Sequence, residues 1–469
     1  DLPLAAAQAA GYLEQTDLPP ADYLRRFRSH RADLLSRGDV VGYSGRLDTT
    51  WALSLERLRC KDPAAVQLLE LAAFLAPEPI PLALFGGHAD LLEEPLRAAA
   101  ADPDALTDTV GALVGYSLAC RQAVSFRVHR LVQAAIRHQL SRDRQQATAQ
   151  RVVALLAVAA PGHPDDPVAW AGYAALAPHV LATGPLSDHD PAGRHLILDT
   201  IRYLHARGDC HGSRAVCEPL LDRWQAILGP DHSDTLAAAS TLILALRSVG
   251  EAAPARALGQ DTLQRCRRVL GPDHSTTLLA AASLTGALAQ LGAAEPARTL
   301  GEDTLQRCRQ VLGPDHPTTL VSATALIAAL NQLGQVKSAC ALGEDTLQRC
   351  RRVLGPDHSN SLLAAAGLTL ALAQLGEAEP ARALGEDALQ RCRRVRGPDH
   401  PLTLVAAAAL TVALGQVGEA ELARALGQTT LQRCRRVLGA EHPITICMAQ
   451  DASMGHLLLG DDAAVDVAS

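Results

Sequence analysis

The stretch Leu312-Gly-Pro-Asp-His-Pro-Thr-Thr319 contains a string, Gly-Pro-Asp-His, that recurs through the second half of the chain. Successive copies are 42 residues apart, and the last, altered copy is Gly439-Ala-Glu-His442. The other copies begin at Gly229, Gly271, Gly313, Gly355 and Gly397. A fixed period of this length is typical of a solenoid, in which each unit buries its apolar face only by stacking on its neighbours. Such stacking leaves a long concave surface, so the repeat predicts binding rather than catalysis.

Each repeat is predicted to be a helix, a tight turn and a second helix, followed by the Gly-Pro-Asp-His connector. In one repeat the helices are predicted at about 276–291 and about 296–311. Gly292 lies where the first helix must end, and Pro296 lies where the second can begin. Aromatic residues make up only 3% of the chain, which favours a core of Leu, Ala and Val between closely packed helices. The sequence therefore predicts an all-α fold.

The composition divides the chain into regions of different character. Helical patterns come first, a winged-helix-like pattern follows, and a helical adaptor leads into six repeats and then a half repeat with a C-terminal tail. In that order the regions are residues 1–45, 46–144, 145–192, 193–441 and 442–469. The winged-helix-like region is assigned on a hairpin that is predicted near Tyr116–Val128, with its turn at Arg121-Gln122.

The overall charge excludes several classes of partner. The net charge of −7 and the isoelectric point near 6.2 give the chain no general attraction to nucleic acid or to anionic membranes. No apolar stretch has the length and flanks of a signal peptide or a membrane span. We therefore expect a cytoplasmic protein that binds neither nucleic acid nor a membrane.

The cysteines and histidines do not predict a metal site. The eleven cysteines include no Cys-x-x-Cys pair, and five of them share one position on the apolar stripe of the second helix. This pattern predicts buried free thiols rather than disulfides or zinc ligands. One histidine per repeat places neighbouring histidines about 10 Å apart, whereas metal ligands lie at about 2 Å. We expect no metal.

Alignment of the first helices on their connectors separates constant positions from variable ones. Alanines and leucines such as Ala239 and Leu242 are constant and are predicted to pack between helices. Three variable columns, spaced four and three residues apart, form one stripe on the helix. We expect this stripe to line a groove that binds a protein or peptide, through residues Ser240, Leu244, Arg247, Gly286, Thr324, Asn331, Leu370 and Val412. Drift at solvent-facing positions is the alternative, and the apolar character of most of these residues favours the groove.

The connector at residues 312–319 resembles that of tetratricopeptide repeats of the 42-residue, kinesin-light-chain-like kind, which have Leu-Gly-x-x-His-Pro-x-Thr. The first-helix leucine Leu326 and the small second-helix residue Ala339 also match the family pattern. The resemblance covers the second half of the chain and implies a right-handed superhelix with first helices on the concave side. The groove asparagines of the kinesin-light-chain group correspond to Thr324-Ala325, so we expect an apolar ligand strand or helix instead of an Asn-bound backbone.

Two short motifs, Asp1-Leu-Pro-Leu-Ala5 and Val128-His129-Arg130, resemble motifs of the NB-ARC nucleotide-binding module of bacterial STAND signalling ATPases. The first is similar to Gly-Leu-Pro-Leu-Ala and the second to Met-His-Asp. The resemblance implies that Pro3 contacts adenine and that His129 senses the diphosphate of bound ADP. From the residues alone, a core histidine with satisfied hydrogen bonds is the alternative for His129.

The sequence lacks the phosphate-binding loop of such an ATPase, because neither of its lysines, Lys61 and Lys337, follows a glycine. Without a Walker A loop the chain cannot be a complete P-loop ATPase. We expect no enzyme activity and no cofactor of its own, so that ADP or ATP would bind only through an upstream module. Because the sequence starts at Asp1 instead of Met, we expect it to be part of a larger protein.

Three functional hypotheses follow from these observations. In the first, the chain is a sensor and scaffold, the repeat-bearing part of an NB-ARC-like signalling ATPase. In the second, it is a free-standing adaptor with no link to a nucleotide. In the third, favoured least, it is a winged-helix transcriptional regulator whose DNA-reading helix lies within Arg127–Arg144 and carries Arg130, Arg137, Arg142 and Arg144. The incomplete last repeat also predicts end-to-end self-association.

Overall fold

The computed structural model describes residues 55–440, together with residues 19, 21, 22, 25, 444–446, 448 and 449. Contacts within the chain divide it into two compact units. Unit 1 comprises Asp1–Gly162 and Ala171–Thr200, and unit 2 comprises His163–Trp170 and Ile201–Ser469. The chain therefore enters unit 2 briefly at residues 163–170 before it returns to unit 1. The predicted adaptor, residues 145–192, contributes to both units.

Unit 1 combines helices with a small antiparallel sheet, in which β3 lies between β1 and β2. A helix covers residues 55–61. The elements that follow are α5 (Pro63–Ala72), β1 (Ile80–Pro81), α6 (Ala83–Gly86), η1 (Ala89–Leu91), α7 (Leu96–Ala101), α8 (Pro103–Gly115), β2 (Ala119–Arg121) and β3 (Ser125–Val128). Helices α6, α7 and α8 thus separate the first strand from the hairpin of β2 and β3.

The predicted hairpin is confirmed, but its turn lies later than expected. Arg121 still pairs with Phe126 in the ladder, and the turn consists of Ala123 and Val124. Val124 is 76% exposed, whereas Phe126 is fully buried. The burial of Phe126 sets the register of the hairpin and outweighs the preference of the polar Gln122 for a turn.

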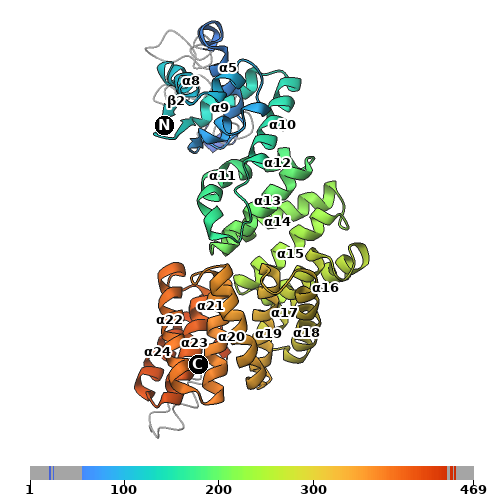
Figure 1. Ribbon diagram of the computed structural model, residues 1–469, viewed down its shortest axis with the longest axis vertical. Coiled ribbons are helices and arrows are strands. Elements are labelled where there is room, and N and C mark those ends of the chain that lie inside the picture. The colour runs from blue at the N-terminus through green and yellow to red at the C-terminus, as the bar shows by residue number, and fades with distance from the viewer. Residues whose placement is uncertain are drawn as a thin grey trace. The chain divides into compact units, whose positions relative to one another are not determined.

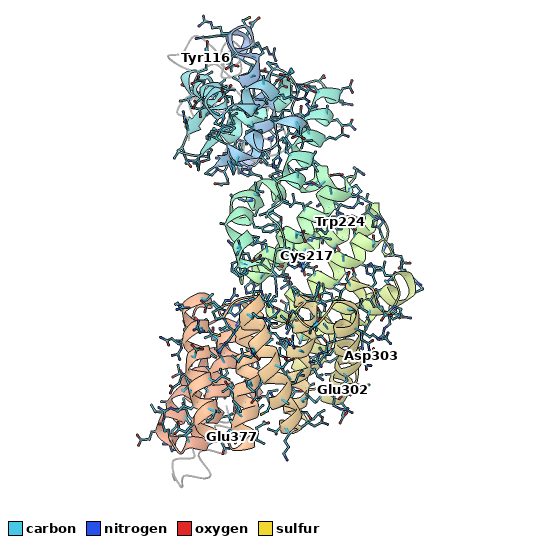
Figure 2. The ribbon with its side chains drawn as sticks, in the orientation of Figure 1. Tyr116, Cys217, Trp224, Glu302, Asp303 and Glu377 are labelled. Atoms are coloured by element: carbon cyan, nitrogen blue, oxygen red, sulfur yellow. The ribbon has the colours of Figure 1, made fainter. Side chains whose placement is uncertain are left out.

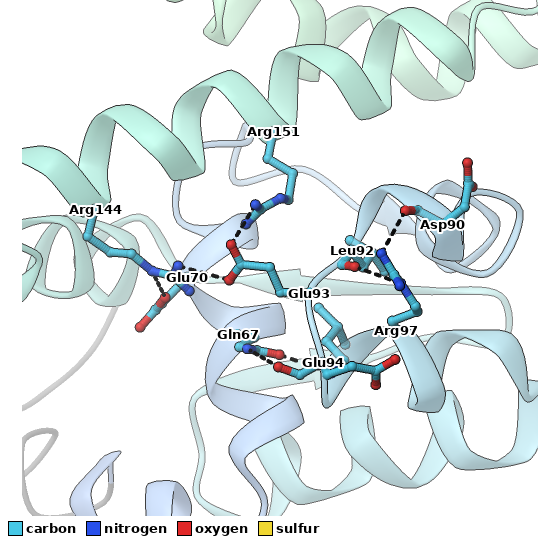
Figure 3. A network of polar contacts seen from close by, with 10 residues as sticks. Gln67, Glu70, Asp90, Leu92, Glu93, Glu94, Arg97, Arg144 and Arg151 are labelled. Carbon is cyan, nitrogen blue, oxygen red and sulfur yellow. Dashed lines mark hydrogen bonds and ion pairs between the residues drawn. The ribbon is translucent and has the colours of Figure 1, made fainter.

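The helices after the sheet are α9 (Arg130–Gln139), α10 (Arg142–Val158), η2 (Pro167–Ala169), α11 (Trp170–Ala182) and α12 (Gly184–Ser187). A polar network connects α10 to the earlier part of unit 1 (Figure 3). In it, Glu93 lies between Arg144 and Arg151, at 3.0 Å and 2.6 Å, and Arg144 also contacts Glu70 of α5 at 3.1 Å. Hydrogen bonds from Arg144 and Arg151 hold the pKa of the Glu93 carboxyl below its ordinary value. Arg144 and Arg151 therefore form ion pairs within unit 1.

Unit 2 consists of helix pairs that stack in chain order (Figure 1). The pairs are α13 (Pro191–Ala206) with α14 (Cys210–Ile227); α15 (Ser233–Ser248) with α16 (Ala252–Val269); α17 (Ser275–Gln290) with α18 (Ala294–Val311); α19 (Pro317–Gln332) with α20 (Val336–Val353); α21 (Ser359–Leu375) with α22 (Ala378–Arg396); and α23 (Pro401–Val417) with α24 (Ala420–Val437). Helix α13 starts in unit 1. The all-α prediction is confirmed, and the bounds of α17 and α18 agree with the predicted ones to within two residues. Most of the predicted half repeat lies outside the described residues.

Constant apolar residues form the core between the stacked helices. Leu326, Leu368 and Ala365 belong to one such cluster of buried side chains. The repeated cysteine is buried as a free thiol in five of the six repeats, as predicted, at Cys266, Cys308, Cys350, Cys392 and Cys434. Burial raises the pKa of the Cys350 thiol to about 12, which keeps it protonated. In the divergent first unit, Cys217 and Trp224 of α14 are likewise fully buried (Figure 2).

The glycine, aspartate and histidine of the connector each have a structural role. Gly313 has a φ of 90°, in the left-handed region where glycine ends a helix. Asp315 accepts hydrogen bonds from Arg349 and Arg352 of the next second helix, at 2.8 Å and 2.7 Å. His316 caps α19, because its Nδ1 accepts a hydrogen bond from the backbone N–H of Thr318 at 3.2 Å. The same cap is made by His232, His274, His358 and His400.

Candidate partner-binding surface

The first helices of the repeats form the inner side of the curved array. The neighbouring first helices α15, α17, α19, α21 and α23 contact one another, whereas neighbouring second helices share few contacts. A stack in which one set of helices lies close together while the other set is spread apart must curve toward the first set. The concave face is therefore lined by first helices.

The middle column of the predicted stripe is the part that stays accessible. Leu244, Ala328, Leu370 and Val412 occupy the same position in different first helices, and each is partly exposed. Gly286, the remaining member, is buried under a neighbouring arginine. Aliphatic side chains that recur at a partly exposed position give an apolar strip of the kind that binds proteins.

The sequence analysis missed a second apolar column, seven residues before the middle one. It consists of Ala237, Leu279, Val321, Leu363 and Val405, most of which are partly exposed. Positions i and i+7 share a face of a helix, so this column extends the apolar strip along each first helix. The seven-residue spacing is the signal that could have found it. We call the two columns together the apolar strip.

The other two columns of the predicted stripe are largely buried between neighbouring helices. Ser240 and Thr324 are buried, and their hydroxyls donate to carbonyl groups four and three residues earlier, each at 2.8 Å. Asn331 donates through Nδ2 to the carbonyl of Gly367 on the next first helix at 2.9 Å. Asn331 thus joins two first helices, the two hydroxyls bond within their own helices, and all three side chains offer a partner little surface.

Arg247, the remaining polar residue of the stripe, is a buried cation that is only 8% exposed. It lies over Gly286, where an added Cβ would stand 2.7 Å from Arg247 Cδ. Its Nε is buried without a partner, and among the described residues no carboxylate forms an ion pair with it. Burial lowers the pKa of the guanidinium, since the charged form loses its hydration. This position would therefore stabilise an anion.

A short segment of the chain lies on the concave face; we call His163–Trp170 the strap. The strap residue Asp165 accepts a hydrogen bond from Arg202 Nη2 of α13 at 2.7 Å. The Trp170 ring lies 6.4 Å from that of His358 at the start of α21, and 6.5 Å from that of Tyr203 of α13, measured between centroids. The strap therefore contacts both the first pair of helices and a helix much later in the array.

Only a small cavity remains between the strap and the first helices. It is lined by Asp165 of the strap, Arg202 of α13, Leu244 of α15, Leu279 of α17, Val321 of α19 and Asn360 of α21. Its volume of about 30 Å³ leaves room for about two water molecules. The strap therefore closes this part of the concave face to a cofactor or a peptide.

Two histidines near the strap are neutral at pH 7. Burial lowers the pKa of His205 to about 3, and its Nε2 lies 2.9 Å from the hydroxyl of Ser248. Burial also lowers the pKa of His358, to about 4. The positive charge close to the strap therefore comes from arginines, and not from these imidazoles.

The nucleotide-sensing residues implied by the NB-ARC resemblance receive no nucleotide pocket from the described residues. Pro3 lies outside them. His129 caps α9, because its Nδ1 accepts from the backbone N–H of Leu131 at 3.3 Å. Burial and the neighbouring arginine charges lower its pKa. His129 thus has the same structural role as the connector histidines, and its contact with ADP remains a proposal.

The segment Arg127–Arg144 is not a single DNA-reading helix. It spans the end of β3, all of α9 and the start of α10. Arg137 donates to the carbonyl of Ala73, and Arg144 is paired with Glu70 and Glu93. Helix α8, which has the place of a recognition helix after α7, contains no lysine or arginine. That helix offers no cation to DNA.

The described residues contain neither a metal-ligand cluster nor a helix fit to cross a membrane. Among the residues that the structure describes, no three His, Cys, Asp or Glu side chains lie close enough to hold a metal ion. None of the described helices combines the length and the apolar character needed to cross a bilayer. The recurrent histidines act instead as helix caps.

Family models identify the repeats. One model for tetratricopeptide repeats matches residues 202–234, 235–276, 277–318 and 403–444, and a second matches residues 321–393. A model for a domain of unknown function, DUF7779, matches residues 55–145. No curated protein matches the sequence.

Several solved structures resemble the chain in fold. A Podosopora anserina putative kinesin light chain with nearly identical TPR-like repeats is 22% identical, over 44% of this chain and 97% of that one, with a TM-score of 0.34. A STAND protein with a tetratricopeptide repeat sensor from Pyrococcus horikoshii is 12% identical, over 97% of this chain and 69% of that one, with a TM-score of 0.46. A Rap protein complexed with Competence and Sporulation Factor is 9% identical, over 70% and 92%, with a TM-score of 0.41.

The family models and the stacked helix pairs agree on the identity of unit 2. Each matched segment falls on consecutive helices between α13 and the end of the described array. The connectors that define the 42-residue period are also the residues that cap and pair the helices. Residues 202–318, 321–393 and 403–444 therefore match tetratricopeptide repeats, and the chain contains an array of these repeats.

Proposed function

We propose that the concave face of the repeats binds a protein or peptide partner through the apolar strip, and that the chain itself is non-catalytic. Tetratricopeptide repeats generally act as protein-interaction scaffolds. The observation that carries the proposal is the apolar strip, in which aliphatic side chains stay partly exposed at two positions of the first helices. Leu370, Val405 and Val412 pack on the core with one side and keep the other side accessible.

We further propose that this scaffold is the sensor part of an NB-ARC-like signalling ATPase. The support is the order of features: a winged-helix-like sheet, then Val128-His129-Arg130 at its edge, then the repeats. An intact-mass measurement on the native protein in its source cell tests this. A polypeptide that is a few hundred residues longer, with a Walker A loop upstream, supports the proposal. A mass near 49.3 kDa contradicts it and favours a free-standing adaptor.

The binding proposal is tested by selection, because the partner need not be known in advance. Peptides that bind the full chain are selected from a random library. Their affinities for the wild type and for the variant Leu244→Glu/Leu370→Glu/Val412→Glu are then compared. Three charges in the apolar strip are expected to weaken binding of the selected peptides at least tenfold. Circular dichroism must show that the variant is folded.

The matched control places the same charge outside the concave face. Val269, Val311 and Val353 lie near the ends of second helices and are partly exposed. The variant Val269→Glu/Val311→Glu/Val353→Glu is expected to bind the selected peptides as the wild type does. Equal binding by the wild type and both variants would show that the peptides do not use the apolar strip.

A further inference from the structure

The strap is an acidic and aromatic segment seated on the concave face. It belongs to unit 2 by its contacts, although the residues on both sides of it, up to Gly162 and from Ala171, belong to unit 1. No repeat contributes it, and it differs in sequence from the connectors. The strap therefore occupies the surface that the proposed function assigns to a partner.

Asp165 is the polar anchor of the strap. Its side chain is 15% exposed and accepts from Arg202 Nη2 at 2.7 Å. Burial alone would raise the pKa of this carboxyl, but the charge and hydrogen bond of Arg202, together with the neighbouring histidines, lower it. The next residue, Asp166, is exposed and accepts only a local bond from the backbone N–H of Val168 at 2.9 Å. Of the two adjacent acids, one is thus recognised by the concave face and the other is not.

Trp170 is the apolar anchor. Its ring meets those of Tyr203 and His358, and its Nε1 donates to the carbonyl of Pro164 at 3.1 Å, so the indole nitrogen is satisfied inside the strap. Between the two anchors, Val168 is 88% exposed, whereas the small side chain of Ala169 is buried. Recognition therefore depends on an acid and on an aromatic ring five residues later.

Two arginines, Arg247 and Arg396, lie near His205, which is one of the residues that line the cavity beneath the strap. Arg247 is buried without an ion-pair partner in the described part of the chain. Arg396 at the end of α22 is also largely buried; its Nη2 donates to Ala206 and Ser359, while Nε and Nη1 have no partner. A buried guanidinium without a carboxylate is costly, so an acidic occupant is favoured over a basic or purely apolar one.

We propose that the part of the concave face bounded by α13, α15 and α21 binds a partner segment with an acidic residue followed five residues later by an aromatic one, and that the strap is the intramolecular occupant which this segment displaces. The inference rests on the proposed function and specifies the chemistry of its partner. A tethered segment has an effective concentration in the millimolar range, so a free peptide making the same contacts competes poorly while the strap is in place.

The test uses a fluorescein-labelled synthetic peptide with the sequence of residues 161–172, titrated by anisotropy into the full chain. The variant Asp165→Asn/Trp170→Ala removes both anchors of the strap and should free the surface. We expect it to bind the peptide at least tenfold more tightly than the wild type does. The matched control, Asp166→Asn, changes the adjacent exposed acid and should bind as weakly as the wild type.

Specificity is tested on the same variant. A peptide with Asn in place of the residue equivalent to Asp165 should bind at least tenfold more weakly, and so should the native peptide when Arg202→Gln is added. If the double variant loses its thermal transition, the single variant Asp165→Asn takes its place, with a smaller gain expected. Equal binding of the native peptide by the wild type and the strap variants overturns the proposal, and so does equal binding of the Asn peptide.

Failure here is distinguishable from failure of the proposed function. Leu370 and Val412 do not line the cavity beneath the strap. In one outcome, binding of the library-selected peptides requires Leu370 and Val412, and no variant binds the strap peptide. The concave face would then bind partners, but not through the contacts that the strap makes. That outcome overturns this inference alone.

Discussion

Two parts of the repeat array differ in what their side chains do. One is the edge formed by the connectors, and the other is the concave face formed by the first helices. At the connectors, the same bonds recur from repeat to repeat: a histidine cap, an aspartate–arginine pair and a glycine with positive φ. On the concave face, corresponding positions carry Leu244, Gly286, Ala328, Leu370 and Val412, which share no common bond. Identical contacts maintain the stack, while the varied positions are available for recognition.

The strongest test of this contrast uses two leucines of α21. Leu368 is buried in the core between repeats, and Leu370 is partly exposed in the apolar strip. Leu368→Ala should lower the free energy of unfolding by about 2–5 kcal/mol, since it leaves a cavity in the core. Leu370→Ala should cost less than about 1 kcal/mol. Urea unfolding of both variants measures the difference, and equal losses would contradict the assignment of the two positions.

Acidification should destabilise the connector edge more than the loss of a single cap does, because several histidine caps need a neutral ring. Burial lowers the pKa of both His358 and His400 to about 4, below the unfolded value of about 6.5. Below pH 6.5 the unfolded chain therefore binds protons that the folded chain does not, and stability falls from pH 6.5 toward pH 4. The melting temperature measured between pH 7.5 and pH 5 should decrease on acidification.

A control isolates the histidine contribution to this pH dependence. His400→Asn keeps an N-cap that does not titrate, so its melting temperature should fall less steeply over the same range. Carboxylates contribute mainly below this window, because their ordinary pKa values are near 4. A wild-type melting temperature that does not change between pH 7.5 and pH 5 would contradict neutral histidine caps.

Loss of one cap should have a moderate effect. His316→Ala removes the acceptor for the backbone N–H of Thr318 and should cost about 1 kcal/mol. His316→Asn should retain most of that stability, since Asn is a strong N-cap residue. Thermal unfolding at pH 7.5 compares the two variants, and a His316→Asn variant no more stable than His316→Ala would count against capping.

The smallest effect is expected from the exposed ion pairs. Asp315 pairs with Arg349 and Arg352 on the surface, where water and salt screen the charges. Asp315→Asn should lower the melting temperature less than His316→Ala does, and the difference from the wild type should shrink in 1 M salt. A loss that persists unchanged at high salt would indicate a role other than charge pairing.

The sequence predicted the repeats well because their signals are local and repeated. Glycine, proline and the apolar period place α17 and α18 to within two residues, and the buried cysteines follow from the spacing within one helix.

The candidate site was predictable only in part, because it depends on contacts that no local pattern encodes. The spacing showed that Ser240, Leu244 and Arg247 share one side of a helix, but not that the neighbouring helices bury the first and the third. The strap was not predicted, since its contacts with Arg202 and His358 require the array to curve. The bond from Arg396 to Ala206 joins residues 190 positions apart, which no 42-residue period specifies.

Whether a partner binds the concave face can be decided by comparing two affinities. A library-selected peptide is titrated by calorimetry into Leu370→Glu, with the charge in the apolar strip, and into Val353→Glu, with the same charge at the end of a second helix. Leu370→Glu should bind the peptide at least tenfold more weakly than the wild type, and Val353→Glu should bind it with wild-type affinity. Equal affinities, or a loss confined to Val353→Glu, would contradict binding at the concave face.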